Sequence, residues 1–401
     1  MRLAGDANRV VVGGTATTWQ DLDADGKLPD PAAVLAHDPR LALSAVRRAV
    51  REGTELLVVS SSRVDDDLRQ DLSGNGFHLV TEDDEQQPAA PREPEAGLVW
   101  ILTSGSTCRP KRIGHTLASL TTVREAQPPR VWLCPYSPGT YAWWQLITLS
   151  LSQPGQDLVV TDPARLDDWP VDAAEHGVTA VSGTPTFWRQ SLYRHGDTLK
   201  SLGLQQITLG GEPVDQPILD HLRESFPAAR ISWIYASSEV GAAVVVHDGR
   251  AGFPTAWLDR DAPGRPRLSV VDGELVVRSP HRGMGIAEWV STGDRAEVVD
   301  GRVLLTGRIA SDEINVGGTK VSAGTVRATL LSHPNVRWAR VRGRKAPLVG
   351  QMVTAEVVTD GTLDEAGLTR WAAEHLAETA VPRRIKLLAE IPVKETLKSD
   401  V

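Results

Sequence analysis

Residues 114–240 alternate between short apolar runs and amphipathic segments, and this alternation constrains the fold more than any other feature of the chain. The predicted strands cover residues 131–134, 157–160, 178–181 and 206–209. The predicted helices between and after them cover residues 143–151, 164–176, 185–193 and 217–226. Such alternation indicates a layered α/β domain.

The pattern changes on the C-terminal side of this region. Residues 265–306 contain short strands separated by Gly and Asp turns, which predicts a β-rich subdomain. After residue 307 the pattern favours a compact α+β unit: helices over 321–333 and 363–376, and strands over 336–342, 352–359 and 384–388. We therefore expect an α/β protein with a large layered domain, residues 1–307, and a small mobile α+β domain, residues 308–401.

Composition excludes several classes of function. The net charge of −8 and the lack of a basic stripe argue against a nucleic-acid partner. No apolar run is long enough to span a membrane, and residues 1–6 lack the apolar core of a signal peptide, so we expect a cytoplasmic protein with no membrane partner. The two cysteines, Cys108 and Cys134, form neither a metal-ligand spacing nor a disulfide framework.

Residues 103–111, with the sequence TSGSTCRPK, form the most informative single segment. They follow an apolar run, residues 97–102, that predicts a buried strand. A hydroxyl-rich turn leaving a strand presents backbone N–H groups, hydroxyls and cations together, as a polyphosphate requires. A plain surface loop is the alternative, and the segment alone does not decide between them.

Further short motifs lie downstream. The segments are Gly210–Pro213, Tyr235–Glu239, Ser291–Asp294, Gly307–Arg308, Asp312–Val321 and Ile391–Lys398. With the segment at 103–111, their order and character resemble the adenylate-forming superfamily of acyl-CoA synthetases, aryl-acid ligases and adenylation domains. The resemblance runs from about residue 7 to the C-terminus, with a shortened N-terminal region.

This resemblance implies an ATP-dependent acid–thiol ligase. A carboxylate attacks the α-phosphate of ATP to give an acyl-adenylate and pyrophosphate, and a thiol then displaces AMP. The thiol is CoA or the phosphopantetheine of an acyl carrier protein, and the acid is the other partner. Two alternatives remain: an adenylating enzyme with an amine or other acceptor, and a non-catalytic homologue that binds a nucleotide or an acyl group.

The resemblance also implies roles for individual residues, with ATP and Mg²⁺ as ligands. The family positions that bind the β- and γ-phosphates correspond to Thr103, Ser104, Gly105, Ser106, Thr107 and Lys111. The family positions that bind the adenosine correspond to Gly210, Gly211, Glu212, Tyr235, Asp294 and Arg308. The catalytic positions match Ser238, Glu239 as the Mg²⁺ ligand, and Lys398. Residue chemistry alone leaves Glu212 open as a solvated carboxylate, Tyr235 as a core tyrosine, and Lys394 as a competitor of Lys398.

Two further sets follow from the same resemblance. The acyl pocket matches Tyr141, Trp143, Thr184, Phe187, Trp233, Ala236 and Gly241, and its aromatic content favours an aromatic, planar unsaturated or medium-chain acid. No aspartate occurs at 141–145, which argues against an α-amino acid. The small residues Gly317 and Gly318 match a tunnel for the thiol arm, and the hinge between domains follows Gly307–Arg308.

Overall fold

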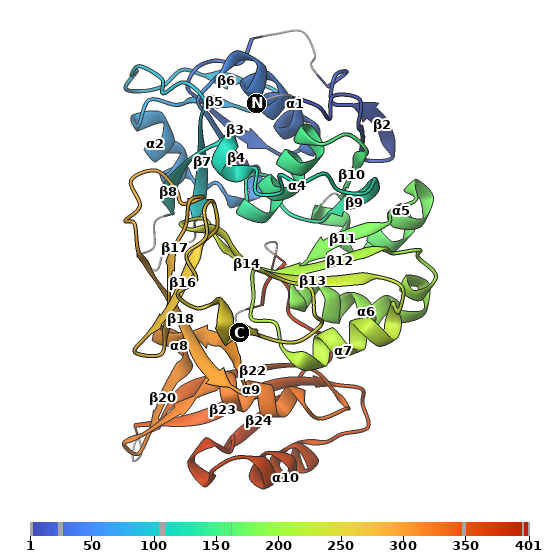
Figure 1. The fold of residues 1–401 in the computed structure, drawn as a ribbon, viewed down its shortest axis with the longest axis vertical. Helices are drawn as coiled ribbons and strands as arrows, with labels where there is room; N and C mark the ends of the chain where they lie inside the picture. Colours follow the sequence, from blue (N-terminus) through green and yellow to red (C-terminus); the bar gives the residue numbers. More distant parts are fainter. Residues whose placement is uncertain are drawn as a thin grey trace.

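The computed structural model describes residues 3–22, 27–103, 110–161, 163–346, 350–394 and 397–399. The strands fall into four sheets. In Figure 1 the sheet with β3 to β8 lies at the top, the β-rich sheet with β16 to β18 lies to the left of β11 to β13 of the central sheet, and the sheet with β20, β22, β23 and β24 lies at the bottom. The alternating layers confirm the α/β class expected from the sequence.

An 8-stranded sheet forms the centre, in the order β14-β13-β12-β11-β9-β10-β1-β2. Its strands are β14 (Gly241–Val246), β13 (Arg230–Ser237), β12 (Gln206–Gly210), β11 (Ala180–Gly183), β9 (Arg130–Cys134), β10 (Gln156–Val160), β1 (Arg9–Val12) and β2 (Thr15–Thr18). All neighbouring pairs from β13 to β1 are parallel, and only the edge strands β14 and β2 pair antiparallel. The carboxyl ends of the parallel strands therefore share one edge, where α/β sheets bind ligands.

The helices that accompany this sheet follow the expected alternation, with one difference. They are α4 (Tyr141–Ser152), α5 (Trp169–His176), α6 (Pro185–Lys200) and α7 (Gln216–Ser225). The helix expected over 164–176 is divided into a 3-10 turn, Pro163–Asp168, and α5. Pro170 stands in the first turn of α5, where its missing N–H costs nothing, so the α-helix begins there.

A 6-stranded sheet lies beside the centre, in the order β6-β5-β3-β4-β7-β8. Its elements are β3 (Ala32–Ala36), β4 (Leu56–Ser60), β5 (His78–Val80), β6 (Glu85–Gln86), β7 (Leu98–Thr103) and β8 (Lys111–Thr116), with helices α1 (Pro39–Glu52), α2 (Asp66–Gly74) and α3 (Leu117–Leu120), and a 3-10 turn at Ser61–Arg63. Strands β7 and β8 are antiparallel, with Thr103 paired to Lys111. The segment 103–111 thus connects two neighbouring strands.

The β-rich region expected over 265–306 is a 5-stranded sheet in the order β15-β19-β18-β17-β16. Its strands are β15 (Phe253–Pro254), β16 (Arg267–Val271), β17 (Glu274–Arg278), β18 (Val290–Val299) and β19 (Arg302–Arg308), with a 3-10 turn at Thr255–Trp257. Strand β19 ends at Arg308, at the position of the proposed domain boundary.

The remaining residues form an α+β unit with its own apolar core, which includes Ile314, Val326 and Leu368. Its elements are α8 (Ile309–Asp312), β20 (Glu313–Val316), β21 (Thr319–Ser322), α9 (Ala323–Leu331), β22 (Val336–Ala346), β23 (Gly350–Thr359), α10 (Glu365–His375), a 3-10 turn at Glu378–Ala380, and β24 (Arg384–Leu387). The helix expected from residue 321 begins at Ala323, because Ser322 ends β21 and caps the helix by accepting the Thr325 N–H at 3.0 Å.

The chain returns from this unit to the central sheet. Trp338 on β22 donates its indole N–H to the Ser399 hydroxyl at 3.1 Å. Leu397 is buried in the large apolar core of the central sheet rather than in the core of the α+β unit. The segment that carries Lys398 therefore packs between the two parts of the molecule.

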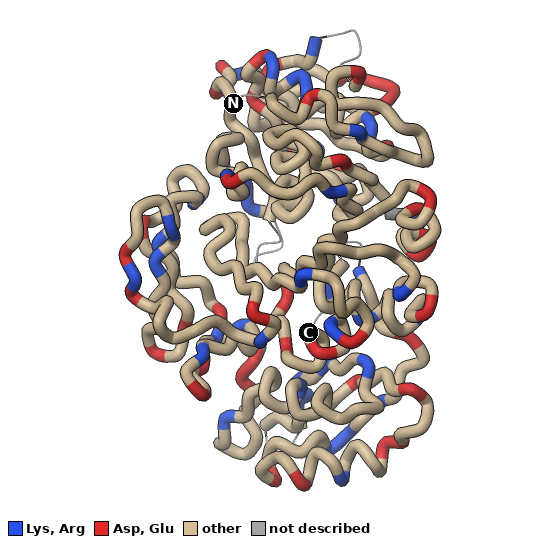
Figure 2. The backbone as a smooth tube through the Cα atoms, turned by 45° about the vertical axis from the view of Figure 1, so that its right-hand side comes forward, with Lys and Arg blue, Asp and Glu red and all other residues tan. Residues whose placement is uncertain are grey.

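Charged residues of both signs are interspersed along the tube in Figure 2. Within the part of the chain that the structure describes, no helix combines the length and the apolar character needed to cross a bilayer.

Candidate active site

A cavity of about 1140 Å³ opens at the carboxyl edge of the central sheet. Its wall includes residues just beyond the strand ends: Ser137 after β9, Thr184 after β11, Gly211 after β12 and Ser238 after β13. Asp294, Arg308 and Lys398 reach the same cavity from the β-rich sheet and the C-terminal segment. Motifs far apart in the sequence thus meet at one place.

Tyr235, Asp294 and Arg308 form a connected polar cluster in this cavity. The Tyr235 hydroxyl donates to Asp294 Oδ2 at 2.6 Å, and Arg308 Nε lies 3.0 Å from Asp294 Oδ1. Burial raises the pKa of Asp294, while the hydrogen bond from Tyr235 and the charge of Arg308 act in the opposite direction. Burial and the nearby Asp294 raise the pKa of Tyr235. The cluster therefore offers a phenol and a paired carboxylate, which suit a planar base and ribose hydroxyls.

Lys398 is buried in the same cavity beside Gly211. A Cβ placed on Gly211 would lie 3.1 Å from Cε of Lys398, and Gly211 has φ +81°. The position therefore favours glycine for its backbone and for the space it leaves the lysine. Burial lowers the pKa of Lys398, the charges of Glu212 and Asp294 oppose this, and Arg308 adds to it. The side chain of Lys398 thus lies among charged groups of both signs, where it can bind an anion.

Main-chain anchors hold the residues on both sides of Lys398. The Ser399 N–H donates to Glu212 Oε1 at 2.9 Å, and the Thr184 hydroxyl donates to the Leu397 carbonyl. Glu212 also accepts the Thr186 N–H at 2.9 Å. We call these contacts the tail anchor: Thr184, Thr186, Glu212, Leu397 and Ser399.

The tail anchor gives Glu212 and Thr184 contacts that the sequence did not indicate. Glu212, expected to skirt adenine, is engaged with the start of α6 and the C-terminal segment. Thr184, expected in the acyl pocket, lines the cavity but also caps α6 by accepting the Phe187 N–H at 3.0 Å. Leu397 has φ +61°, in the left-handed region that glycine adopts most readily.

Ser238 and Glu239 line the cavity at the turn between β13 and β14. His115, at the end of β8, fixes this turn: its Nε2 lies 2.7 Å from the Ser238 carbonyl, and its Nδ1 lies 3.0 Å from the Ser119 hydroxyl. Burial lowers the pKa of His115, which favours a neutral ring. Sequence reasoning missed His115, because a lone histidine in a strand carries no motif.

The predicted phosphate segment is described only at its two ends. Thr103 lines the cavity, and its hydroxyl donates to the Lys111 carbonyl at 3.5 Å. Ser104, Gly105, Ser106 and Thr107 lie outside the described residues. Lys111 does not line the cavity.

The acyl-pocket prediction is divided by the structure. Tyr141, Thr184, Trp233 and Ala236 line the cavity, together with the adenine-segment residues Gly210, Gly211 and Glu212. Trp143, Phe187 and Gly241 do not line it.

The physical reasons for these exclusions are local. Two positions along α4 turn a side chain about 200° around the helix, so Tyr141 faces the cavity while Trp143 is fully buried in the core. Phe187 on α6 packs against Trp169 and Trp188, with ring centroids 5.5 Å and 5.7 Å away. A Cβ on Gly241 would lie 2.8 Å from the backbone oxygen of His281, so another segment of the chain covers that position.

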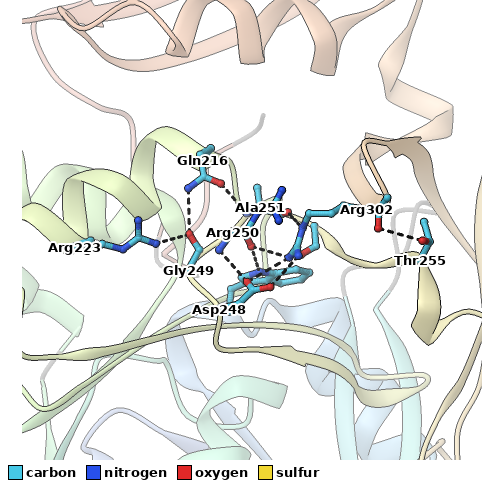
Figure 3. Close-up of polar contacts among 11 residues, drawn as sticks. Gln216, Arg223, Asp248, Gly249, Arg250, Ala251, Thr255 and Arg302 are labelled. Atoms are coloured by element: carbon cyan, nitrogen blue, oxygen red, sulfur yellow. Dashed lines mark hydrogen bonds and ion pairs between the residues drawn. The ribbon is translucent and has the colours of Figure 1, made fainter.

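The loop of residues 248–251 is held by several hydrogen bonds and contacts the indole of Trp233. The Trp233 indole N–H donates to the Arg250 carbonyl at 3.0 Å. Arg302 pairs with Asp248 at 2.8 Å and donates to the Ala251 carbonyl at 2.7 Å (Figure 3). Gln216 also joins this loop: its side-chain oxygen accepts the Ala251 N–H at 2.9 Å. These contacts give one wall of the cavity a fixed shape.

The cavity also has hydrogen-bonded polar groups beside its aromatic lining. On the face of the sheet that it covers, Gln206 donates to the Ser232 hydroxyl at 3.0 Å, and Ser232 lies 2.7 Å from His247 Nδ1. The Tyr136 and Ser182 hydroxyls lie 3.0 Å apart on the same wall. No sequence motif marked these residues, because the parallel register of the sheet, rather than sequence proximity, brings them together.

Gly317 and Gly318 lie elsewhere. They connect β20 to β21 and line a separate open cavity of about 730 Å³ with Asn315, Lys345 and Gln351. The structure therefore does not bring them to the site that holds Lys398.

Comparison with known proteins gives two family matches along the chain. The family described as "AMP-binding enzyme" matches residues 27–286, and the family described as "AMP-binding enzyme C-terminal domain" matches residues 326–398. A 2-succinylbenzoate–CoA ligase of Bacillus cytotoxicus is 28% identical over 242 residues, which cover 54% of this chain and 49% of the relative. The mitochondrial malonate–CoA ligase of Homo sapiens is 34% identical over 157 residues, 35% of this chain and 27% of the relative. The matched regions thus span about half or less of these curated relatives.

Solved structures share the whole architecture. An amide bond synthetase from Marinactinospora thermotolerans superposes with a TM-score of 0.75 at 20% identity, covering 100% of this chain and 97% of the other. The o-succinylbenzoate CoA synthetase from Bacillus subtilis, in complex with its acyl-adenylate intermediate, superposes with a TM-score of 0.70 at 19% identity, covering 99% and 94%. At these identities the likeness establishes the fold.

Proposed function

Because the chain belongs to the AMP-binding enzyme family, we propose that it activates a carboxylic acid with ATP and transfers the acyl group to a thiol, that of CoA or of a phosphopantetheine. The observation that carries the proposal is the meeting of Lys398 with Tyr235, Asp294 and Arg308 in one cavity. A nucleotide-binding cluster and a buried cation are there adjacent to a pocket that can hold an acid.

Each group in this cluster has a task that its geometry suits. Asp294 accepts hydrogen bonds from the ribose hydroxyls, and the Tyr235 ring packs against adenine. Lys398 neutralises charge where the carboxylate attacks the α-phosphate, since two anions must approach one another there. The tail anchor holds Lys398 in place for this first half-reaction.

Glu239 fits the Mg²⁺ that such a reaction uses. The described residues contain no group of three acidic, histidine or cysteine side chains that could hold a metal by themselves. A single carboxylate at the cavity wall is nevertheless sufficient, because Mg²⁺ is held by one or two carboxylates together with substrate phosphates. When bound, the ion screens the negative charge of the triphosphate.

Pyrophosphate release from ATP with a panel of carboxylic acids tests the proposal. Release that depends on one class of acid, followed by thioester formation with CoA, is the expected result. Release without a CoA thioester would direct the search to a carrier protein or an amine acceptor. Measurable ATP binding with no release for any acid would contradict the proposal and favour a binding protein without catalysis.

Asp294→Asn is expected to raise the KM for ATP more than it lowers kcat. The amide replaces a charged acceptor of two hydroxyls, and a hydrogen bond to a charged group contributes about 1.5–3 kcal/mol, or roughly 10- to 100-fold in affinity. Steady-state kinetics with ATP varied provide the measurement. Asp300→Asn, in the turn between β18 and β19, is the matched control, because asparagine tolerates its positive φ of 47°. An unchanged KM for Asp294→Asn would remove Asp294 from the nucleotide site.

A further inference from the structure

The cavity extends beyond the reaction centre, along the face of the central sheet. On β13, Ala236 lies near the nucleotide cluster, and Ser232 and Arg230 follow on the same face towards the start of the strand. Arg130 at the start of β9 and Gln206 at the start of β12 line the same distant end. From residue 236 back to residue 230 the strand spans about 20 Å. An acid bound with its carboxylate near Lys398 therefore points its other end towards the two arginines.

Arg130 and Arg230 have no acidic partner among the residues that the structure describes. Within the described ranges, no ion pair joins either guanidinium to a carboxylate, although Glu125 also lines this end. Arg130 Nε is buried without a hydrogen-bond partner, and Arg130 Nη1 reaches only the Pro128 carbonyl, at 3.5 Å. Buried polar groups in proteins are normally bonded, so this unpartnered N–H requires an explanation.

The two arginines also oppose one another electrostatically. Burial lowers the pKa of Arg130, and the charge of Arg230 lowers it further. Burial and the same Arg230 lower the pKa of His247, which faces Ser232. An anion bound between two like charges relieves their repulsion. A structural role would instead show each arginine bonded to a carboxylate or to several carbonyls, as Arg302 is.

The surroundings are built to keep this end in place. His247 directly precedes the loop that Arg302 and Gln216 clamp (Figure 3). Gln206 donates to Ser232 and to the Ile207 carbonyl, both at 3.0 Å, so the floor of the cavity is already hydrogen-bonded. The guanidinium groups of Arg130 and Arg230 therefore keep hydrogen-bonding capacity for a ligand.

We infer that the acid substrate carries a second carboxylate, which Arg130 and Arg230 bind at the far end of the cavity, and that an extended spacer separates its two acid groups. This inference rests on the proposed function and specifies its substrate class. The reacting carboxylate lies at Lys398, and the second is neutralised by the arginines without taking part in the chemistry. Arg130 and Arg230 are thus specificity-determining residues.

A matched pair of substrates isolates the second charge. Pyrophosphate release is measured with α,ω-dicarboxylic acids from glutaric to sebacic acid, with phenylene-spaced diacids, and with the monomethyl ester of each. The ester keeps the spacer of the diacid and adds one methyl group, but it removes one charge. We expect kcat/KM for the best diacid to exceed that of its ester by about 10- to 100-fold, as for a lost hydrogen bond to a charged group.

Arg130→Gln and Arg230→Gln complete the test as a double-perturbation cycle. Each substitution is expected to raise the KM for the diacid, to leave kcat nearly unchanged, and to remove most of the difference between diacid and ester. Arg370→Gln, exposed on α10, changes the net charge equally and should have no effect. Thermal unfolding of each variant separates loss of binding from loss of folding. Because Arg230 is exposed, Arg230→Gln is the variant whose folding is least disturbed.

The outcomes of these experiments distinguish failure of the second-carboxylate site from failure of the proposed function. If esters and simple monocarboxylic acids release pyrophosphate as well as the diacids, or if Arg130→Gln and Arg230→Gln affect diacid and ester equally, the second-carboxylate site is wrong while adenylation stands. If none of the acids releases pyrophosphate, the proposed function itself fails and the inference fails with it.

Discussion

Lys398→Ala is expected to reduce the rate of acyl-adenylate formation by about 100- to 1,000-fold, the effect of removing one preorganised group that stabilises charge in a transition state. Lys398 is buried beside Gly211, and its cation lies among Glu212, Asp294 and Arg308. Transfer to the thiol from a supplied acyl-adenylate should remain largely intact, because the lysine acts where the two anions meet. Pyrophosphate release and thioester formation measure the two halves separately.

Lys394→Ala is the matched control for this experiment. Lys394 lies four residues earlier in the same segment, and its backbone N–H donates to the Lys398 carbonyl at 2.9 Å, but its side chain does not line the cavity. We expect this variant to keep most of the adenylation activity. Equal losses in both half-reactions for Lys398→Ala would contradict the role assigned to it, and a larger loss for Lys394→Ala would transfer that role to Lys394.

Glu55→Gln is expected to lower the free energy of unfolding by about 3–5 kcal/mol, the range for breaking a buried ion pair by removing one partner. Glu55 is completely buried at the start of β4 and accepts from Arg92 at 2.5 Å and 2.8 Å, from the Trp100 indole at 2.6 Å, and from the Glu95 N–H at 2.6 Å. One carboxylate therefore joins β4 to residues 92–95 and to Trp100 on β7. Denaturant unfolding measures the loss, and Glu374→Gln, exposed on α10, is the control.

The same carboxylate makes a pH-dependent contribution to stability. The pKa of Glu55 is lowered: burial alone would raise it, but the hydrogen bonds from Arg92, Glu95 and Trp100 together outweigh burial. A group with a depressed folded pKa contributes its full stability above its unfolded pKa, near 4.3, and loses that contribution as the pH falls through its folded pKa. The difference in unfolding free energy between Glu55→Gln and the parent protein should therefore narrow below about pH 4. A difference that stays constant down to pH 3 would show that the Glu55 charge is not responsible.

The resemblance to a known family predicted that Tyr235, Asp294 and Arg308 belong to one site. They are far apart in the chain, and the structure brings them together in one hydrogen-bonded cluster. A helix over residues 143–151 was also expected, and α4 begins two residues earlier, at Tyr141. The pattern of an almost wholly apolar helix does not reveal which of its faces meets a cavity. For this reason the sequence assigned Trp143 to the pocket, whereas the structure places it in the core.

The far end of the cavity could not be predicted for a different reason. Arg130 and Arg230 stand at the starts of strands separated in the sheet by β11 and β12, and only the register of those strands aligns them. The contacts of Glu212 depend likewise on where residues 397–399 return to the large part of the molecule. Local propensity carries no information about such long-range placement.

The tail anchor also bears on the order of events in time. Residues on both sides of Lys398 are bonded to the large part of the molecule through Thr184 and Glu212, whereas Trp338 bonds the same segment to the small part. A rotation of the small part must therefore break the bonds on one side of this segment, either those to Thr184 and Glu212 or the one from Trp338. If the bonds to Thr184 and Glu212 break, Lys398 leaves the cavity together with the small part. The two half-reactions of the proposed function would then take place in two separate arrangements of the chain, one with the cation in the cavity and one without it.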